Sequence, residues 1–390
     1  MVEWPTALVL GQKSFLLKTN SVELALTVSG GMLGPVTFRP EEGTTIAPYA
    51  VAPWAEESVG PDTAAVLRSL RGDWFCSAFG ANEQSHAGAQ LPLHGETANN
   101  RWTFEAGRTT KAGAWLRIGL DLPLQGGRCE ATTALLTGQT VIYQRHALSA
   151  LTGPINPGHH STLAFPNREG AGRLSFSPHI LAKTFPEPVE NDDSRGRSFL
   201  ALDNDIADLT RAKGVDGATT DLLSFPARRG FEDTALICAD PAHEYAWSAV
   251  TFAQERYVWF SLRNTRQLSS TLLWFSNGGR YYPPWNGRHI NVMGIEDITA
   301  YFAAGIGASC RANPLSMKGI RTCLEPDEAG RLSIPYIQGI ACIPESFGCL
   351  VRMQYRPGSL QLVGASGASV TVGCQTDFLR TGRLPEFPFD

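Results

Sequence analysis

Short runs with strand chemistry recur along most of the chain, and in several of them apolar and polar side chains alternate. A period of two residues places one face of an extended segment on a core and the other in solvent, as in antiparallel sheets. The chain contains 39 glycines and 25 prolines, many of which separate these runs as turn residues do. The predicted strands cover residues 21–29, 115–124, 140–148, 173–181, 257–264, 270–277, 349–357 and 368–379.

Helical patterns are scarce by comparison. The best helix candidate is the segment 297–313, in which Asp297 can cap the first turn and an alanine-rich sequence follows. Strands and helices do not alternate regularly, which disfavours a doubly wound α/β fold. We therefore predict an all-β fold, a large antiparallel β-sandwich with few short helices. The polar, poorly periodic segment 184–220 is predicted to run over a sheet edge or over a cleft.

Length and charge narrow the possible functions. The chain has 390 residues, of which 43% are hydrophobic, so it can bury a large core. Its formal charge is −4 and it has no run rich in lysine or arginine, so we expect no nucleic-acid partner. No apolar stretch is long enough for a membrane span, and the first 20 residues lack a signal-peptide pattern, so we expect a cytoplasmic protein without a membrane partner. The sequence leaves the oligomeric state open.

The eight cysteines are dispersed along the chain, with no CxxC pair and no common zinc spacing. The expectation is therefore that they are reduced and mostly buried, as in a cytosolic protein. The sequence also lacks the GxGxxG, Walker, HExxH and GxSxG motifs. The sequence therefore gives no sign of a dinucleotide site, a nucleoside triphosphate site, a zinc-protease site or a serine-hydrolase nucleophile.

Two adjacent histidines, His159 and His160, precede a small apolar run that resembles a strand. Consecutive strand residues point to opposite faces, so the pair cannot bind one metal ion and only one member can face a given cleft. A metal site would need a distant partner such as His94, His146 or a carboxylate. A packing role is the commonest one for a lone histidine.

Two further segments are rich in residue types that bind sugars. Residues 90–105 place His94 in a turn-rich loop before Trp102, and residues 277–298 combine glycine, arginine and aromatic residues and end close to Glu296. Aromatic rings stack on the C–H faces of a pyranose, while charged and amide groups bond its hydroxyls. Together these segments indicate a small-molecule sugar as the substrate.

The order of these motifs resembles the aldose 1-epimerase (galactose mutarotase-like) family. The matching motifs are His94-Gly95 followed by Trp102, the segment from Asn156 to His160-Ser161, and a late Gly-Ile-Glu ending at Glu296. The resemblance covers residues 20–300 and implies a galactose mutarotase-like supersandwich. It implies a single domain over 1–390, in which 300–390 extends the sheets beyond the usual family core, and it implies no metal and no organic cofactor.

The resemblance also implies roles for individual residues. His160 would be the general acid, Glu296 the general base, and His94 a substrate-binding residue. A further family carboxylate corresponds to Glu232 or Asp233 in "GFEDTAL", with Asp233 preferred. The other predicted substrate-binding residues are Arg71, as the family arginine upstream of the His-Gly loop, and Arg280, Arg288 and Trp285 in the loop 277–298.

The implied reaction interconverts the α and β anomers of an aldose. The base removes the C1 hydroxyl proton while the acid protonates the ring oxygen, and the opened aldehyde rotates before the ring closes again. Arg280 or Arg288 would keep Glu296 ionised by lowering its pKa. His160 can supply a proton near neutral pH, and His159 would support the loop.

Several alternatives stay open from the sequence. The chain could be a hexose-6-phosphate 1-epimerase with a phosphate seat at Arg280, Arg288 and His289. Alternatives to this leading hypothesis are a non-catalytic carbohydrate-binding protein and a metal-assisted hydrolase or lyase. Structural roles compete as well: Glu296 could stabilise a helix N-terminus, His94 could bond its own turn, and Asp233 could be a surface acid. The loop arginines could be structural, and Trp74, Trp102 and Trp274 are more typical of a core.

Overall fold

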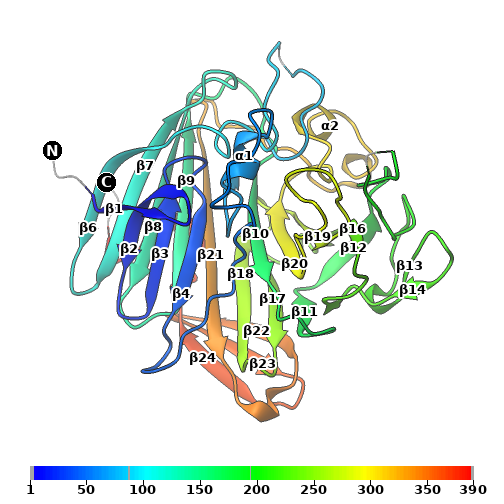
Figure 1. Cartoon of the computed structure of the whole chain (residues 1–390). Coiled ribbons are helices and arrows are strands. Elements are labelled where there is room, and N and C mark those ends of the chain that lie inside the picture. The colour runs from blue at the N-terminus through cyan, green and yellow to red at the C-terminus, as the bar shows by residue number, and fades with distance from the viewer. Residues whose placement is uncertain (1–3, 87, 194, 388–390) are drawn as a thin grey trace.

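Two large antiparallel sheets pack face to face and form the body of the molecule (Figure 1). The computed structural model describes residues 4–86, 88–193 and 195–387. The first sheet has six strands in the order β12–β16–β19–β20–β10–β5. Their bounds are His179–Thr184, Phe231–Ala239, Ser270–Asn277, Val292–Ile298, Gly158–Ala164 and Phe75–Cys76.

The second sheet has nine strands in the order β15–β11–β17–β18–β21–β9–β8–β7–β6. In that order, their bounds are Ser224–Phe225, Gly172–Phe176, Tyr245–Phe252, Tyr257–Asn264, Leu332–Cys342, Val141–Ser149, Arg128–Leu136, Gly113–Asp121 and Thr103–Thr109. The predicted all-β class is confirmed.

Among the described residues, three smaller sheets and several short helices accompany the two large sheets. A four-stranded sheet, β1–β4, precedes it in the chain, and β22–β24 form a three-stranded sheet near the C-terminus. The small-sheet strands are Thr6–Val9, Gln12–Lys18, Val22–Thr27 and Leu33–Phe38 (β1–β4), Ala212–Lys213 and Thr219–Thr220 (β13 and β14), and Leu350–Arg356, Ser359–Gly364 and Ser369–Gly373 (β22–β24). The α-helices are Ala65–Arg68 (α1), Ile306–Ser309 (α2) and Phe378–Thr381 (α3), and the 3₁₀ turns are Leu209–Arg211, Ser316–Lys318 and Glu345–Phe347.

Strand β18 shows how the sequence determines the layering. Trp259 belongs to the main core between the sheets, whereas Phe260 and Leu262 belong to a second core that also contains Leu350 and Leu360 from the C-terminal sheet. Alternate side chains of one strand point to opposite faces. Because both faces of β18 are covered, its first four residues, 257–260, are all hydrophobic or aromatic.

The segment 300–390 contributes to two layers. Strand β21 pairs with β18 on one side and β9 on the other, in the middle of the nine-stranded sheet. Strands β22–β24 instead form their own sheet over the outer face of that sheet. No helix in the described part of the chain is long and apolar enough to cross a membrane.

The strands predicted at 257–264 and 270–277 coincide with β18 and β19. The segment 173–181 holds two strands rather than one, β11 and the start of β12, because the chain leaves the sheet near Pro178. The segment 368–379 likewise contains β24 and then the start of α3. The other predicted strands match β3, β7, β9 and β22 to within a few residues.

The helix predicted over 297–313 is wrong for most of its length. Asp297 lies in β20, and only Ile306–Ser309 is α-helical. The Asp297 carboxylate accepts hydrogen bonds from buried groups of the opposite sheet, among them the Ser261 hydroxyl at 2.6 Å. These tertiary contacts outweigh the local helix propensity.

The expectation that all cysteines are reduced is also wrong. Cys310 and Cys323 form a disulfide, with their Cα atoms 5.2 Å apart. It links the end of α2 to the segment that leads into β21. The remaining six cysteines are free thiols, and Cys76, Cys129, Cys238 and Cys374 among them are buried as expected.

Candidate active site

A cavity of about 830 Å³ lies on the face of the six-stranded sheet that points away from the nine-stranded sheet. Its floor consists of side chains from β10, β16, β19 and β20. Its walls come from α1 and the segments 80–84, 185–189, 280–285 and 301–308. The excursion that begins at residue 184 therefore borders a cleft, which was one of its two predicted positions.

Strand register brings the predicted acid and base together on this floor. His160 of β10 lies directly opposite Glu296 of β20, and Glu296 lies opposite Leu272 of β19. The His160 Nε2 and Glu296 Oε1 atoms are 3.2 Å apart, and both side chains are almost fully buried. A Cβ on Gly294 would overlap Glu296 Oε1, so the glycine of the Gly-Ile-Glu motif leaves room for the carboxylate.

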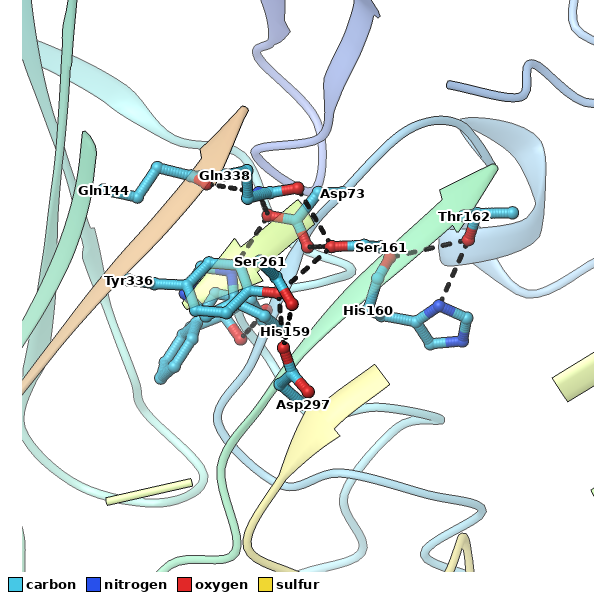
Figure 2. Close-up of polar contacts among 12 residues, drawn as sticks. Asp73, Gln144, His159, His160, Ser161, Thr162, Ser261, Asp297, Tyr336 and Gln338 are labelled. Atoms are coloured by element: carbon cyan, nitrogen blue, oxygen red, sulfur yellow. Dashed lines mark hydrogen bonds and ion pairs between the residues drawn. The ribbon is translucent and has the colours of Figure 1, made fainter. Parts of the chain in front are cut away.

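His159 faces the opposite side of β10, as strand alternation requires (Figure 2). Its Nδ1 lies 2.9 Å from Asp73 Oδ2, and its ring stacks on Tyr336 at a centroid distance of 3.9 Å. The structure therefore places His160 at the cavity and His159 in the core between the sheets.

Aromatic packing fixes the His160 ring. It stacks on Trp74 with centroids 4.0 Å apart, and the edge of Trp274 approaches at 5.7 Å. Thr162 Oγ1 lies 3.3 Å from His160 Nδ1, which leaves Nε2 toward Glu296. Both tryptophans line the cavity, although their sequence context was more typical of a core.

Burial controls the protonation of the His160–Glu296 pair. It raises the pKa of Glu296 well above its usual value, and the opposing charge of Arg280 does not reverse this. Burial also lowers the pKa of His160 well below its usual value, with smaller contributions from His94 and Arg280. Arg280 does lower the pKa of Glu296, as predicted, but desolvation is the larger effect, so the expectation of a net lowered pKa is wrong. Both shifts favour the uncharged forms of the pair, a neutral imidazole and a carboxylic acid, which together hold one exchangeable proton.

His94 lines the cavity with its ring edge-on to His160, at a centroid distance of 5.0 Å. Its φ of 62° and the hydrogen bond from the Gly95 amide to the Pro92 carbonyl place it in a tight turn, and its own amide donates to the Gly80 carbonyl. The Gly80 amide donates to Nδ1 at 3.4 Å. Burial, with a contribution from Arg280, lowers the pKa of His94 to about 3, so the ring is neutral. His94 therefore has both of its predicted positions, in a turn and at the cavity. Because Nδ1 accepts a hydrogen bond, the proton of the neutral ring is on Nε2, which can donate to a ligand.

Arg280 and Trp285 also line the cavity, as predicted for the loop 277–298. The Arg280 guanidinium lies 4.5 Å from the centroid of the Trp285 ring. Its Nε contacts Glu190 Oε1 at 2.6 Å and is 4.0 Å from Glu232 Oε2. One cation thus has two carboxylates beside it.

Solved structures resemble this architecture, although no family model and no curated protein matches the sequence. A galactose mutarotase related enzyme from Lactobacillus acidophilus aligns at a TM-score of 0.53 and 10% identity, over 84% of this chain and 97% of its own. A galactose mutarotase-like protein from Clostridium acetobutylicum aligns at 0.55 and 11% identity, over 87% and 98%. Both similarities extend over most of this chain.

The chain has the galactose mutarotase-like fold. At identities this low the likeness establishes the architecture only, and the activity has to be argued from the residues in the cavity. Those residues project from the six-stranded sheet of the galactose mutarotase-like fold and from the loops around its cavity.

The preference for Asp233 over Glu232 is corrected. Glu232 accepts hydrogen bonds from Trp274 Nε1 and Ser276 Oγ, both at 2.9 Å, which places its carboxylate behind the cavity floor. Burial raises its pKa to about 7, against the effect of Arg280. Asp233 points to the opposite side of β16, where it accepts the backbone amides of Phe199 and Leu200. Asp233 is therefore neither a cavity residue nor the surface acid of the alternative interpretation.

Two predicted arginines and one histidine lie outside the cavity of this mutarotase-like fold. Arg71 is buried elsewhere and donates to the carbonyls of Val9 and Leu10. Arg288 forms a two-pronged ion pair with Glu57 at the surface. His289 packs on Trp274 and bonds Ser276, behind the cavity floor.

Sequence reasoning missed three features of the site. Thr234 and Leu272 lie on the floor, and Glu190 holds Arg280. Their cavity-side position follows from strand register and long-range contacts, and no local motif signals it. Among the described residues, no group of three or more histidine, cysteine, aspartate or glutamate side chains could hold a metal ion.

Proposed function

We propose that this chain is an aldose 1-epimerase-like enzyme that interconverts the α and β anomers of an aldose by general acid/base ring opening. The observation that carries the proposal is the buried His160–Glu296 pair, 3.2 Å apart on the floor of a cavity with tryptophan walls. An acid and a base side by side match the substrate, because O1 and O5 are attached to the same carbon.

In each step the His160–Glu296 pair gives one proton to the sugar and takes one proton from it. His160 Nε2–H donates to O5 while Glu296 takes the O1 proton, so the C1–O5 bond breaks and C1=O1 forms. The pair then consists of a neutral imidazole and a carboxylic acid, the forms that burial favours. After rotation about C1–C2, O5 attacks the other face of the carbonyl. The carboxylic acid returns its proton to O1 and the imidazole regains its own from O5.

The neighbouring side chains support this chemistry. His94 Nε2–H can bond a sugar hydroxyl, and the Trp74, Trp274 and Trp285 rings line the same space and offer apolar surface to the C–H groups of a pyranose. Because these rings exclude water, the proton transfer takes place in a medium of low dielectric constant.

The test is polarimetry on freshly dissolved α-D-glucose and α-D-galactose. We expect the wild-type protein to accelerate the decay of optical rotation in proportion to its concentration. If neither sugar nor any other common aldose responds, this function is ruled out. Sugar binding in that case would leave the non-catalytic carbohydrate-binding alternative.

The pH dependence of the catalysed rate is a further prediction. The active pair holds one proton, so activity falls in acid as the pair gains a second one. His160 then becomes charged at its lowered pKa while Glu296 stays protonated and cannot take the O1 proton. Activity falls in alkali as the pair loses its last proton at the raised pKa of Glu296. We therefore expect a plateau through neutral pH without an inflection near the ordinary histidine value of about 6.5. After subtraction of the spontaneous rate, a single titration with its midpoint at that value would contradict this account.

A further inference from the structure

The cavity is larger than one sugar ring requires. A pyranose occupies roughly 200 Å³ when it is packed at protein density, whereas the cavity holds about 830 Å³. The inner part of the cavity, formed by His94, His160, Trp274, Trp285 and Glu296, accommodates the ring that reacts. A single ring of roughly 200 Å³ in this position leaves most of the 830 Å³ unfilled.

The remaining space is bordered by what we term the outer subsite, which comprises Glu83, Gln84, Phe185, Glu187 and Tyr301. These side chains are partly or fully exposed, in contrast to the buried His160 and Glu296. The outer subsite is therefore the mouth of the same cavity.

The outer subsite has the composition of a second sugar site. Phe185 and Tyr301 both pack on the buried Phe302, with centroid distances of 5.2 and 5.3 Å, so their rings are held in place. The nearby Glu187 carboxylate contributes to the raised pKa of Tyr301, after burial and Asp203. Fixed aromatic rings beside carboxylate and amide groups can bind the C–H face and the hydroxyls of a pyranose.

The wall that carries Tyr301 is preformed. The Ala81 amide donates to the Ala303 carbonyl, and Asn82 Oδ1 accepts the Ile306 amide at 2.9 Å. The Cys310–Cys323 disulfide fastens the end of α2 behind this wall. A preformed wall reduces the ordering cost of binding an additional ring.

The charges of the cavity favour an uncharged ligand. Arg280 is the one cationic side chain among the described residues that line the cavity, and Glu190 and Glu232 already lie beside it. The outer subsite adds two further carboxylates, Glu83 and Glu187. A phosphate would lie among these acids without a free cation. The two other members of the predicted phosphate cluster, Arg288 and His289, do not line the cavity.

We propose that the substrate is a neutral reducing oligosaccharide. Its reducing ring would enter the inner part of the cavity, and its next ring would stack on Phe185 and Tyr301 in the outer subsite. This inference rests on the proposed function, because the reducing ring is the one whose anomers exchange.

The test compares kcat/KM for reducing disaccharides with that for the free hexose of their reducing end. Maltose, cellobiose, lactose and gentiobiose are compared with glucose, and galactose- and mannose-ended disaccharides with galactose and mannose. We expect at least one disaccharide to exceed its hexose about tenfold, and glucose 6-phosphate to react no faster than glucose. Equal or higher values for every free hexose, or a preference for the phosphate, would overturn the inference.

Variants of the outer subsite localise the effect. Phe185→Ala and Tyr301→Ala should each lower the disaccharide-to-hexose ratio about fivefold, since each removes one stacking face, and leave hexose turnover unchanged. Tyr281→Ala is the matched control, because Tyr281 is an exposed tyrosine (44%) that does not line the cavity. Equal losses on hexose and disaccharide would contradict a second ring site.

Calorimetric titration separates this inference from the proposed function. If no saccharide shows accelerated anomer exchange, the proposed function fails, but maltose and glucose can still be titrated into the same protein. Tighter binding of the disaccharide that is lost in Phe185→Ala would support the outer subsite. Equal affinity for both sugars, or no binding of either, would overturn it.

Discussion

Glu296→Gln and His160→Ala are each expected to lower catalysed anomer exchange by at least about 10³-fold, which is within the range of a lost acid or base. Glutamine keeps the shape of the side chain but cannot take the O1 proton, and alanine removes the donor to O5. Because both groups act on one proton, the double variant should be barely worse than either single variant. Polarimetry after subtraction of the spontaneous rate measures all three.

Two exposed residues provide matched controls for these substitutions. Glu345→Gln and His243→Ala change the same residue types far from the cavity, and their turnover should equal that of the wild type. Circular dichroism checks that the variants fold. Near-normal activity in folded Glu296→Gln would show that Glu296 is not the base. It would also contradict the role of the His160–Glu296 pair in catalysis.

The largest effect on stability is expected from Asp297→Ala. Asp297 is fully buried and contacts Arg263 at 2.7 Å, and the hydroxyls of Thr271 and Tyr336 donate to it at 2.7 and 2.9 Å. Alanine leaves the buried Arg263 charge without its carboxylate, which costs about 3–5 kcal/mol of unfolding free energy. Urea unfolding followed by fluorescence measures this loss as a lower midpoint.

Asp121→Ala is the control for the same type of ion pair at the surface. Asp121 pairs with Arg128 while remaining exposed, so its removal should cost less than about 1 kcal/mol. Similar losses for both variants would show that burial does not decide the strength of these contacts. Asp297 is also adjacent to Glu296 on the opposite face of β20, so Asp297→Ala is expected to reduce activity as well.

The same buried network also anchors the floor of the cavity. Asp73 accepts from the Gln338 amide at 2.8 Å and from the Ser161 hydroxyl at 3.1 Å (Figure 2). Ser161 and His159 flank His160 in β10 and point into this network, just as Asp297 does next to Glu296. Both strands are therefore tied to the nine-stranded sheet by the residues that alternate with the acid and the base.

Alternation in the sequence was sufficient to locate many of the strands but not the helix. Strands β18 and β19 follow from apolar runs bounded by turn residues. The stretch beginning at Asp297 carries a helical signature, yet its side chain bonds Ser261 and Arg263 from the opposite sheet. Such partners lie far away in the chain and have no local signal.

The site shows the same division between local and long-range information. Alternation established that only one of His159 and His160 can face the cavity, and the family resemblance selected His160. Which of Glu232 and Asp233 faces the cavity side of β16 depends on the pairing with β19, where Thr234 lies opposite Trp274. The sequence alone does not give this pairing. The positions of Arg71 and Arg288 were wrong because their partners, the Val9 carbonyl and Glu57, are remote in sequence.

The most direct test of a shared acid and base is NMR magnetisation exchange between the α and β H1 signals of a reducing sugar at equilibrium. We predict exchange that grows with the concentration of wild-type protein and vanishes with Glu296→Gln, while the sugar still binds. Sugar binding without exchange in the wild type, or unchanged exchange in the variant, would contradict the account.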